Sequence, residues 1–460
     1  MSVLDFFKVS APSEKKVPAD QVDKTYKKLR FSCFVAVTLA YSFYYVCRTT
    51  LNVVKKPIID AGLLDATQLG IVGSCLLFAY GLGKFINGLL VDHSNTKRFM
   101  AFGLLVSTVA NLLMGILGFS ATTAGISSMV FFGFFCVLWA VNGYVQSIGA
   151  PSSIVTLTRW YPIKIRGTYY GFFSASHNFG EWLSFLLVGL IVAHFGWQWG
   201  FFGATIAGVL GLIIILLMVH DTPESKGLPS VEELSGEEPS TSDTTDHAET
   251  ARIQKAVFRN VGVWILAASA AFMYVSRYAV NSWGVIFLQE KKGFDLADAT
   301  FIVSINAIFG IIGTVFSGWI SDKMFGGDRK LPALVAGILE VIALALFLFG
   351  GDSWALNIAA MVLFGIAIGV LICFLGGLMA IDLVPRKATG AALGIVGLAS
   401  YLGAGIQDVI SGVLIEGHAV VDEAGTRVYD FTPASWFWIV AAAVSFMLPI
   451  LNWKRKQQQI

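Results

Sequence analysis

Twelve long apolar stretches, separated by short polar connections, run through most of the chain. A helix needs about 20 mostly apolar residues to cross the hydrocarbon core of a bilayer, and these stretches are long enough. The pattern predicts an all-α polytopic membrane protein with twelve transmembrane helices. The predicted helices cover residues 31–54, 68–91, 98–119, 126–149, 167–194, 197–219, 259–288, 297–321, 331–350, 353–381, 388–416 and 434–453.

A polar segment, residues 220–258, interrupts this pattern at the middle of the chain. It is acidic, rich in Ser, Thr, Pro and Gly, and has no apolar period, so we expect a flexible linker. The predicted organisation is an N-terminal tail (1–30), a six-helix half (31–219), the linker (220–258), a second six-helix half (259–453) and a C-terminal tail (454–460).

The composition supports a membrane environment. Of the 460 residues, 56% are hydrophobic and 13% are charged, with a mean hydropathy of +0.71. A soluble domain could not keep that much apolar surface from water. The net charge of +2 does not indicate a nucleic-acid partner. The five cysteines are scattered through apolar stretches, so we expect no disulfide framework, metal site or cofactor.

The distribution of Lys and Arg predicts that both termini are cytoplasmic. In that orientation 24 of the 32 basic residues lie in cytoplasmic segments and 5 in outside loops, among them Lys55 and Lys56. This bias follows the positive-inside rule, and the polar, lysine-rich N-terminus does not resemble a cleavable signal peptide. Three cations remain inside predicted helices: Arg48, Lys84 and Arg277.

Both arginines belong to an internal repeat. Phe43-Tyr-Tyr-Val-Cys-Arg48, followed by Asn52, matches Phe272-Met-Tyr-Val-Ser-Arg277, followed by Asn281, at an offset of 229. Pro and Gly positions at the entries to the fifth and eleventh helices repeat at an offset of 223. We therefore expect two pseudo-symmetric halves that flank a site at the middle of the membrane.

A second repeated element follows the second and eighth helices. Gly88-Leu-Leu-Val-Asp92 corresponds to Gly318-Trp-Ile-Ser-Asp322, and basic residues follow both. This pattern resembles the loop signature of the major facilitator superfamily. We interpret Asp92 and Asp322 as gating-loop residues that cap helices or pair with loop arginines and do not touch substrate.

The two arginines are the main candidates for substrate binding. A cation at the bilayer centre costs about 2.5–3.5 kcal/mol on insertion scales, and this cost recurs at equivalent places in both halves. Two facing guanidinium groups repel unless an anion lies between them, and each can donate a fork of hydrogen bonds to phosphate oxygens. The pair predicts a phosphate clamp. The alternative is structural pairing with an intramembrane acid, namely Glu181, Glu340 or Asp408.

Polar residues on the same helix faces complete the candidate site. Their spacing of three, four or seven residues places each set on one helical stripe. Lys84 binds substrate or anchors Asp92, and His177 is a proton-gaining ligand or a packing residue; both alternatives stay open. The candidates besides Arg48 and Arg277 are Lys84, His177, Tyr41, Tyr45, Tyr80, Tyr274 and Asn281.

These residues resemble the organophosphate:phosphate antiporter family over nearly the whole chain. The similar segments include Ala79-Tyr-Gly-Leu-Gly-Lys84, Ser176-His-Asn178, Asp221-Thr-Pro-Glu-Ser225 and Tyr401-Leu-Gly403. The resemblance of the last segment adds Tyr401 to the substrate-binding candidates. The resemblance implies exchange of inorganic phosphate for an organic phosphate, such as a sugar phosphate or glycerol 3-phosphate, by a rocker-switch motion. It also implies that Arg48 and Arg277 hold the phosphate, in a monomer of a bacterial-type inner membrane.

The sequence departs from the family pattern in ways that leave the organic part of the substrate open. Thr49 follows Arg48 where a lysine is expected, and Leu393 and Val396 replace the Asp and Lys typical of the hexose-6-phosphate branch. Two rival functions remain, a membrane sensor of sugar phosphate on the same fold and a facilitator of a non-phosphorylated anion. No nucleophile–base pair or phosphate-binding loop indicates an enzyme.

Overall fold

The computed structural model describes residues 3–236, 255–326, 328–384, 389–421 and 427–452. The predicted tail 454–460 and residues 237–254 of the predicted linker therefore lie outside the described residues. Within them, twelve helices are long and apolar enough to cross a membrane, which confirms the predicted fold class. The two strands form a small antiparallel hairpin, β1 (Ala419–Val421) and β2 (Arg427–Tyr429), with Val420 opposite Val428.

The first half of the chain forms a six-span bundle whose fourth and fifth spans are each split into two helices. Its helices are α2 (Val22–Asp60), α3 (Ala66–Val91), α4 (Thr96–Ala124), α5 (Ser128–Gln146), α6 (Gly149–Trp160), α7 (Ile163–Ser174), α8 (Ser176–Phe195) and α9 (Trp197–Met218). Before α2 lie α1 (Val3–Phe7) and η1 (Ala19–Gln21). The split between α7 and α8 falls at Ala175, two residues before His177.

The second half repeats this arrangement. Its helices are α12 (Val261–Lys292), α13 (Leu296–Met324), α14 (Lys330–Phe349), α15 (Trp354–Cys373), η3 (Phe374–Leu378), α16 (Met379–Ile381), α17 (Thr389–Gly417), α18 (Thr432–Met447) and η5 (Leu448–Asn452). The second helix of each half packs against the fifth span of the other half, α3 against α17 and α13 against α8. This reciprocal packing confirms two pseudo-symmetric halves.

Short polar side chains define where several of these helices begin. Asp65 accepts a hydrogen bond from the backbone N–H of Gln68, whose side chain accepts from the N–H of Asp65, so α3 starts with a capping box. The side-chain oxygens of Asn95 and Asp295 accept hydrogen bonds from backbone N–H groups in the first turns of α4 and α13, and so cap these helices. Gly293 ends α12 with a φ of 70°, a conformation that glycine adopts without steric cost.

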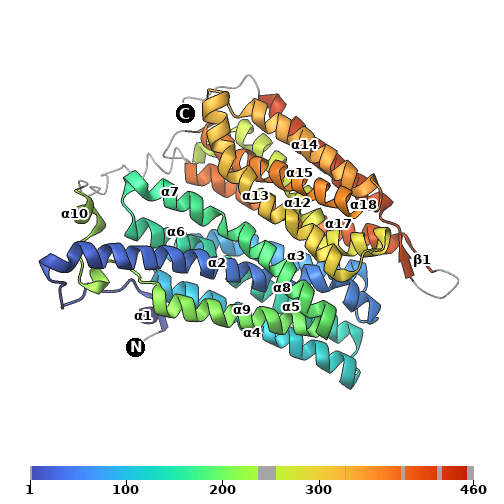
Figure 1. Cartoon of the computed structure of the whole chain (residues 1–460), viewed down its shortest axis with the longest axis horizontal. Coiled ribbons are helices and arrows are strands. Elements are labelled where there is room, and N and C mark those ends of the chain that lie inside the picture. The colour runs from blue at the N-terminus through green and yellow to red at the C-terminus, as the bar shows by residue number, and fades with distance from the viewer. Residues whose placement is uncertain (1–2, 237–254, 327, 385–388, 422–426, 453–460) are drawn as a thin grey trace.

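The bundle has two ends, which we name by the chain. The terminus end carries α1, the start of α2 and the end of η5, and the far end carries the α2–α3 connection and the β1–β2 hairpin (Figure 1). In Figure 1 the helices of the two halves converge at the far end and diverge toward the terminus end. This arrangement places the middle of α2 and α12, where Arg48 and Arg277 lie, between the two halves.

The first part of the predicted linker is folded. After α9 the chain forms η2 (Glu224–Lys226) and α10 (Val231–Ser235), and Leu228 and Val231 are buried. Backbone N–H groups of Ser13 and Val17 donate to the carbonyls of Glu224 and Gly227, which ties the N-terminal tail to this segment. The prediction of a flexible linker therefore does not hold for residues 220–236, because the first half supplies the apolar surface that this segment buries.

Candidate functional site

Arg48 lies on α2 in a pocket of tyrosines. Its Nη2 donates a hydrogen bond of 2.8 Å to the hydroxyl of Tyr278, and its guanidinium carbon lies 4.1 Å from the ring centre of Tyr80. The rings of Tyr45 and Tyr401 follow at 5.3 and 5.5 Å. Arg48 is only 5% exposed, and within the described part of the chain no carboxylate forms an ion pair with it. Its partners are neutral rings and one hydroxyl.

Arg277 on α12 has a different environment. Its Nη2 lies 3.4 Å from Oε2 of Glu181, and the other oxygen of Glu181 accepts a hydrogen bond of 2.7 Å from Nδ2 of Asn281. Among the described residues, Arg277 thus pairs with an intramembrane acid, which was the alternative to a phosphate clamp, and Arg48 does not. The other two candidate acids have different partners, since Glu340 accepts from the hydroxyl of Ser276 and Asp408 pairs with Lys55.

Tyrosine rings connect the two arginines. The hydroxyl oxygen of Tyr278 accepts the hydrogen bond from Arg48, and the ring centre of Tyr278 lies 5.7 Å from the guanidinium carbon of Arg277. Tyr274 stacks on Tyr278 at 5.8 Å and lies 5.5 Å from Tyr401, which is 4.5 Å from Tyr80. The sequence analysis missed Tyr278, although its place four residues after Tyr274 on the same helical stripe could have revealed it.

The remaining candidates lie around this cluster. Nζ of Lys84 is 5.5 Å from the ring centre of Tyr401, and the ring of His177 is 5.8 Å from that of Tyr45. Tyr41 packs against Tyr45 at 5.5 Å. Asn281 joins the cluster through Glu181 and not through either guanidinium group. The structure thus brings the ten candidates to one region between the halves, with Glu181 and Tyr278 added.

At the far end, a fully buried ion pair joins the two halves. Nζ of Lys55 on α2 lies 3.2 Å from Oδ1 of Asp408 on α17, and their side chains are 1% and 2% exposed. The same oxygen accepts from the hydroxyl of Ser282 at 2.7 Å and from Nε1 of Trp283 at 2.6 Å. Nζ of Lys55 also lies 3.6 Å from the centre of the Trp283 ring. Lys55 was assigned to an outside loop, but α2 continues past it and the second half buries it.

Other contacts close the same end. Lys56 pairs with Glu290, and the backbone N–H of Ala66 donates to Oε2 of Glu416 at 3.1 Å. Each of these contacts joins one half to the other. A side chain in place of Gly73 on α3 would collide with the Asp408 carboxylate, so this glycine permits the close approach of α17. The structure therefore represents a conformation that is closed at the far end.

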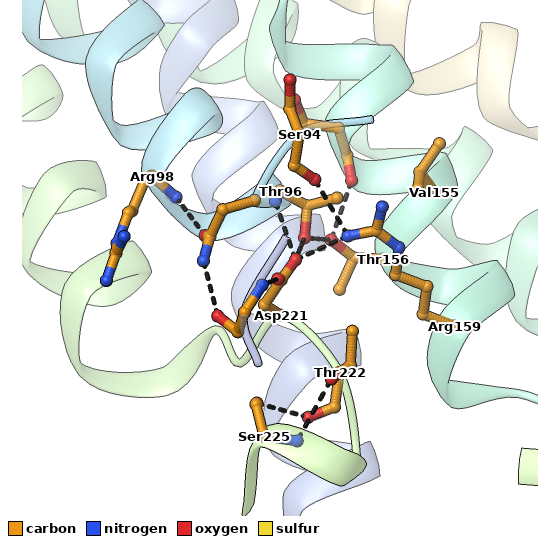
Figure 2. Close-up of polar contacts among 12 residues, drawn as sticks. Ser94, Thr96, Arg98, Val155, Thr156, Arg159, Asp221, Thr222 and Ser225 are labelled. Carbon is orange, nitrogen blue, oxygen red and sulfur yellow. Dashed lines mark hydrogen bonds and ion pairs between the residues drawn. The ribbon is translucent and has the colours of Figure 1, made fainter. Parts of the chain in front are cut away.

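At the terminus end, the buried carboxylate of Asp221 joins its own segment to the N-terminal tail, α4 and α6 (Figure 2). It accepts from the N–H of Ser10 at 2.8 Å, the N–H of Thr96 at 2.9 Å and Nη1 of Arg159 at 2.6 Å. Arg159 also donates to the backbone carbonyl of Asp92 at 3.0 Å. Arg159, in the last turn of α6, therefore pairs with Asp221, which the sequence analysis had noted only as part of a family motif. The side chain of Asp322, the other predicted gating residue, lies outside the described part of the structure.

His220 precedes this carboxylate and is half-buried. Burial, together with the nearby charges of Lys226 and Lys97, lowers the pKa of His220 to about 4. A pKa this low keeps the imidazole neutral at physiological pH. Among these neighbours, Arg159 alone is therefore a positively charged partner of Asp221. The ion pair between them does not depend on the protonation of His220.

We expect Asp221→Asn to destabilise the first half by about 1.5–3 kcal/mol, because it removes hydrogen bonds to a charged acceptor. Asp92→Asn is the matched control, since Asp92 is exposed and contributes a backbone carbonyl to the cluster. Thermal unfolding of the purified proteins in detergent measures both effects. Equal unfolding midpoints for the two variants would contradict this role of Asp221.

Taken together, the geometry defines a twelve-span membrane protein with a cationic, tyrosine-lined site between two similar halves. The family model "Major Facilitator Superfamily" matches residues 37–407. The chain belongs to the Major Facilitator Superfamily. The proteins to which it is similar include organophosphate transporters, so it is a relative of transporters and not of enzymes.

Three curated relatives cover most of the chain. The glycerol-3-phosphate transporter of Haemophilus influenzae is 32% identical over 85% of this chain and 87% of its own length. The probable hexose phosphate transport protein of Chlamydia pneumoniae is 33% identical over 85% and 87%, respectively. The membrane sensor protein UhpC of Salmonella typhimurium is 30% identical over 88% and 90%.

Among solved structures, a bacterial homologue of the human lysosomal transporter Spinster, described as inward-facing and unoccupied, has the same fold. It is 17% identical, with a TM-score of 0.72, and the match covers 94% of this chain and 100% of that chain. At this identity the likeness concerns the fold alone, and it agrees with the two-half architecture described above.

Proposed function

We propose that this protein exchanges a phosphorylated organic anion for inorganic phosphate by alternating access. The observation that carries the proposal is the meeting of Arg48 from one half and Arg277 from the other at the same residue, Tyr278. An anion held by both guanidinium groups would connect the halves at the middle of the membrane. The names of the relatives support a sugar phosphate, glycerol 3-phosphate or phosphoglycerate as the organic substrate.

The charges of the site support a dianion. Arg48, Arg277 and Lys84 supply three positive charges, and Glu181 removes one when it is ionised. The remaining charge of two matches that of a phosphate group, about −1.5 to −2. A carboxylate or sulfonate carries a single negative charge and would leave a buried cation uncompensated, which is costly in a membrane interior.

The aromatic lining fits an organic phosphate as well. Tyr45, Tyr80, Tyr274 and Tyr401 surround the arginines, and a tyrosine hydroxyl can donate to phosphate or sugar oxygens while its ring packs against apolar surface. We assign Tyr41, His177 and Asn281 to the edge of this site.

The conformation supports alternating access. The contacts of Lys55, Lys56 and Ala66 close the far end, while the halves diverge at the terminus end (Figure 1). We place the terminus end in the cytoplasm because basic residues concentrate there, in a bacterial inner membrane with the protein as a monomer. The described conformation then faces the cytoplasm, and phosphate that bridges the arginines draws the halves together.

Radiolabelled phosphate exchange in proteoliposomes tests this function. We expect vesicles loaded with inorganic phosphate to take up labelled phosphate, and an excess of the correct organic phosphate outside to suppress this uptake. Glycerol 3-phosphate, hexose 6-phosphates and phosphoglycerates are compared with a sulfonate and a dicarboxylate. Suppression by the sulfonate or dicarboxylate, with none by any phosphate, would contradict the proposal.

The same measurement distinguishes the sensor alternative, which the relative named as a membrane sensor favours. A sensor would bind an organic phosphate, seen as a thermal shift of the purified protein, without exchanging labelled phosphate. Binding without exchange would therefore favour the sensor function over transport.

A further inference from the structure

Glu181 forms a bridge between the two halves at the place where substrate phosphate would bind. It lies on α8 in the first half, while Arg277 and Asn281 lie on α12 in the second half. Its two oxygens are both engaged, one at 3.4 Å from Arg277 and the other at 2.7 Å from Asn281. Asn281 is itself held by Nδ2 of Asn306 at 3.3 Å. Glu181, Arg277 and Asn281 are all buried.

This carboxylate belongs to the substrate site. Glu181 follows His177 by one helical turn on α8, and the ring of His177 contacts Tyr45, which flanks Arg48. A carboxylate on Arg277 is chemically a single-charge substitute for a phosphate group. The protein therefore carries its own anion at one of the two guanidinium groups of the clamp.

The geometry of this contact is loose. A charge-assisted N–H···O hydrogen bond is usually about 2.7–2.9 Å long, whereas the Glu181–Arg277 separation is 3.4 Å. A phosphate group, with more charge and more acceptor oxygens, can displace such a contact. Arg48 has no corresponding carboxylate among the described residues, so it stays available to an incoming anion.

We propose that Glu181 is a built-in counter-anion that takes the place of phosphate at Arg277 when the site is empty. With Glu181 at Arg277, the empty protein keeps a contact between its halves. Its empty site can then reorient from one side of the membrane to the other without bound substrate. The protein then catalyses net flow of its phosphorylated substrate as well as exchange. This inference rests on the proposed function, because it requires phosphate to be the anion that Glu181 replaces.

The physical reason lies in the charge of the empty site. Exchange is obligatory when only the loaded protein can change conformation, which follows if bare guanidinium groups repel each other as the halves approach. Glu181 cancels one of these charges and joins α8 to α12. Since Arg48 remains uncompensated, the empty protein should reorient more slowly than the loaded one, and net flow should be slower than exchange.

The test compares two modes of flux in proteoliposomes loaded with labelled inorganic phosphate. Efflux into phosphate-free buffer measures net flow, and efflux into buffer with unlabelled phosphate measures exchange. Equal potassium on both sides with valinomycin prevents a membrane potential from stopping net flow. The variants are Glu181→Gln, which removes the charge, and Glu340→Gln, a matched change of another buried intramembrane glutamate that bonds Ser276 within one half.

We expect wild-type protein and Glu340→Gln to show net efflux. In Glu181→Gln, net efflux should fall about tenfold, as expected for the loss of one charge-assisted contact. The KM for phosphate in exchange should decrease, because phosphate no longer has to displace a carboxylate from Arg277. Wild-type protein without net efflux, or Glu181→Gln with unchanged net efflux, would overturn the inference.

Two further outcomes are distinguishable. Loss of exchange as well as net flow in Glu181→Gln would contradict a role confined to the empty protein. Glu181→Asp keeps the charge and should retain exchange, so it separates this outcome from misfolding. If wild-type protein showed no phosphate exchange at all, the proposed function would fail and the inference with it.

Discussion

Arg48→Lys and Arg277→Lys should each reduce the kcat/KM of phosphate exchange by about 10–100-fold, the equivalent of about 1.5–3 kcal/mol for hydrogen bonds to a charged group. Lysine keeps the positive charge but presents a single ammonium group in place of the planar fork of guanidinium donors. A clamp between two halves needs this geometry, because each arginine must reach phosphate oxygens from a fixed direction.

The two variants should differ in size of effect. Arg277 must give up its contact with Glu181 before it can bind phosphate, so part of its interaction with phosphate only replaces an existing one. Among the described residues, Arg48 donates to the hydroxyl of Tyr278 and otherwise contacts aromatic rings. We therefore expect the larger loss in Arg48→Lys.

Initial rates of labelled phosphate exchange at several phosphate concentrations measure both losses. Arg98→Lys, on the surface of the terminus end, is the matched control and should exchange at close to the wild-type rate. Size-exclusion profiles and thermal unfolding show whether each variant is folded. Full exchange activity in either Arg48→Lys or Arg277→Lys would refute the clamp.

The sequence was sufficient to predict the twelve spans because the signal for a membrane helix is local. A run of apolar residues of the right length predicts a span whatever surrounds it. The same reasoning exposed Arg48 and Arg277, since a cation inside an apolar run is visible without any tertiary information. Their equivalence in the repeat then predicted that they would meet between the halves.

The contacts between the halves could not be predicted in this way. Glu181 and Arg277 are 96 residues apart, and Lys55 and Asp408 are 353 apart. The sequence offered three acids as possible partners and no means to choose among them. Lys55 was placed in an outside loop because the apolar run ends near it, yet α2 continues to Asp60 and the opposite half covers it.

The folded part of the predicted linker has a similar explanation. Residues 220–236 lack an apolar period of their own, so their composition indicated flexibility. Leu228 and Val231 are nevertheless buried, and Asp221 is held by donors from three other segments. A segment without its own core can order itself on a surface that the rest of the chain provides, and composition does not reveal that surface.

Asp408→Asn should shift the conformational equilibrium toward opening of the far end. The substitution keeps an oxygen that accepts from Ser282 and Trp283 but leaves Lys55 as an unpaired buried cation. Breaking a buried ion pair by removing one partner costs about 3–5 kcal/mol, which corresponds to a change of about two to four powers of ten in a conformational equilibrium. Opening the far end relieves this cost because it returns the ammonium group to water.

The double variant Lys55→Met with Asp408→Asn provides the decisive control. It removes both charges and retains the acceptor for Ser282 and Trp283, and replacement of a whole buried ion pair is often neutral. We therefore expect the double variant to return to the closed far end of the wild-type protein. Glu290→Gln, which breaks the Lys56–Glu290 pair, should have a smaller effect than Asp408→Asn, because Lys56 is 25% exposed and keeps Asp60 as a second partner.

Spin labels report the separation of the halves at this end. They are attached to cysteines that replace Ala61 in the α2–α3 connection and Val420 in the β1–β2 hairpin, in a cysteine-free background. Double electron–electron resonance should show a longer distance for Asp408→Asn than for the wild-type protein and the double variant. If Asp408→Asn kept the short distance, the buried pair would not hold the far end closed. If the single and double variants opened equally, the attraction between the charges would matter less than the packing of α17 against α3, and closure would depend on the shape of the interface around Gly73.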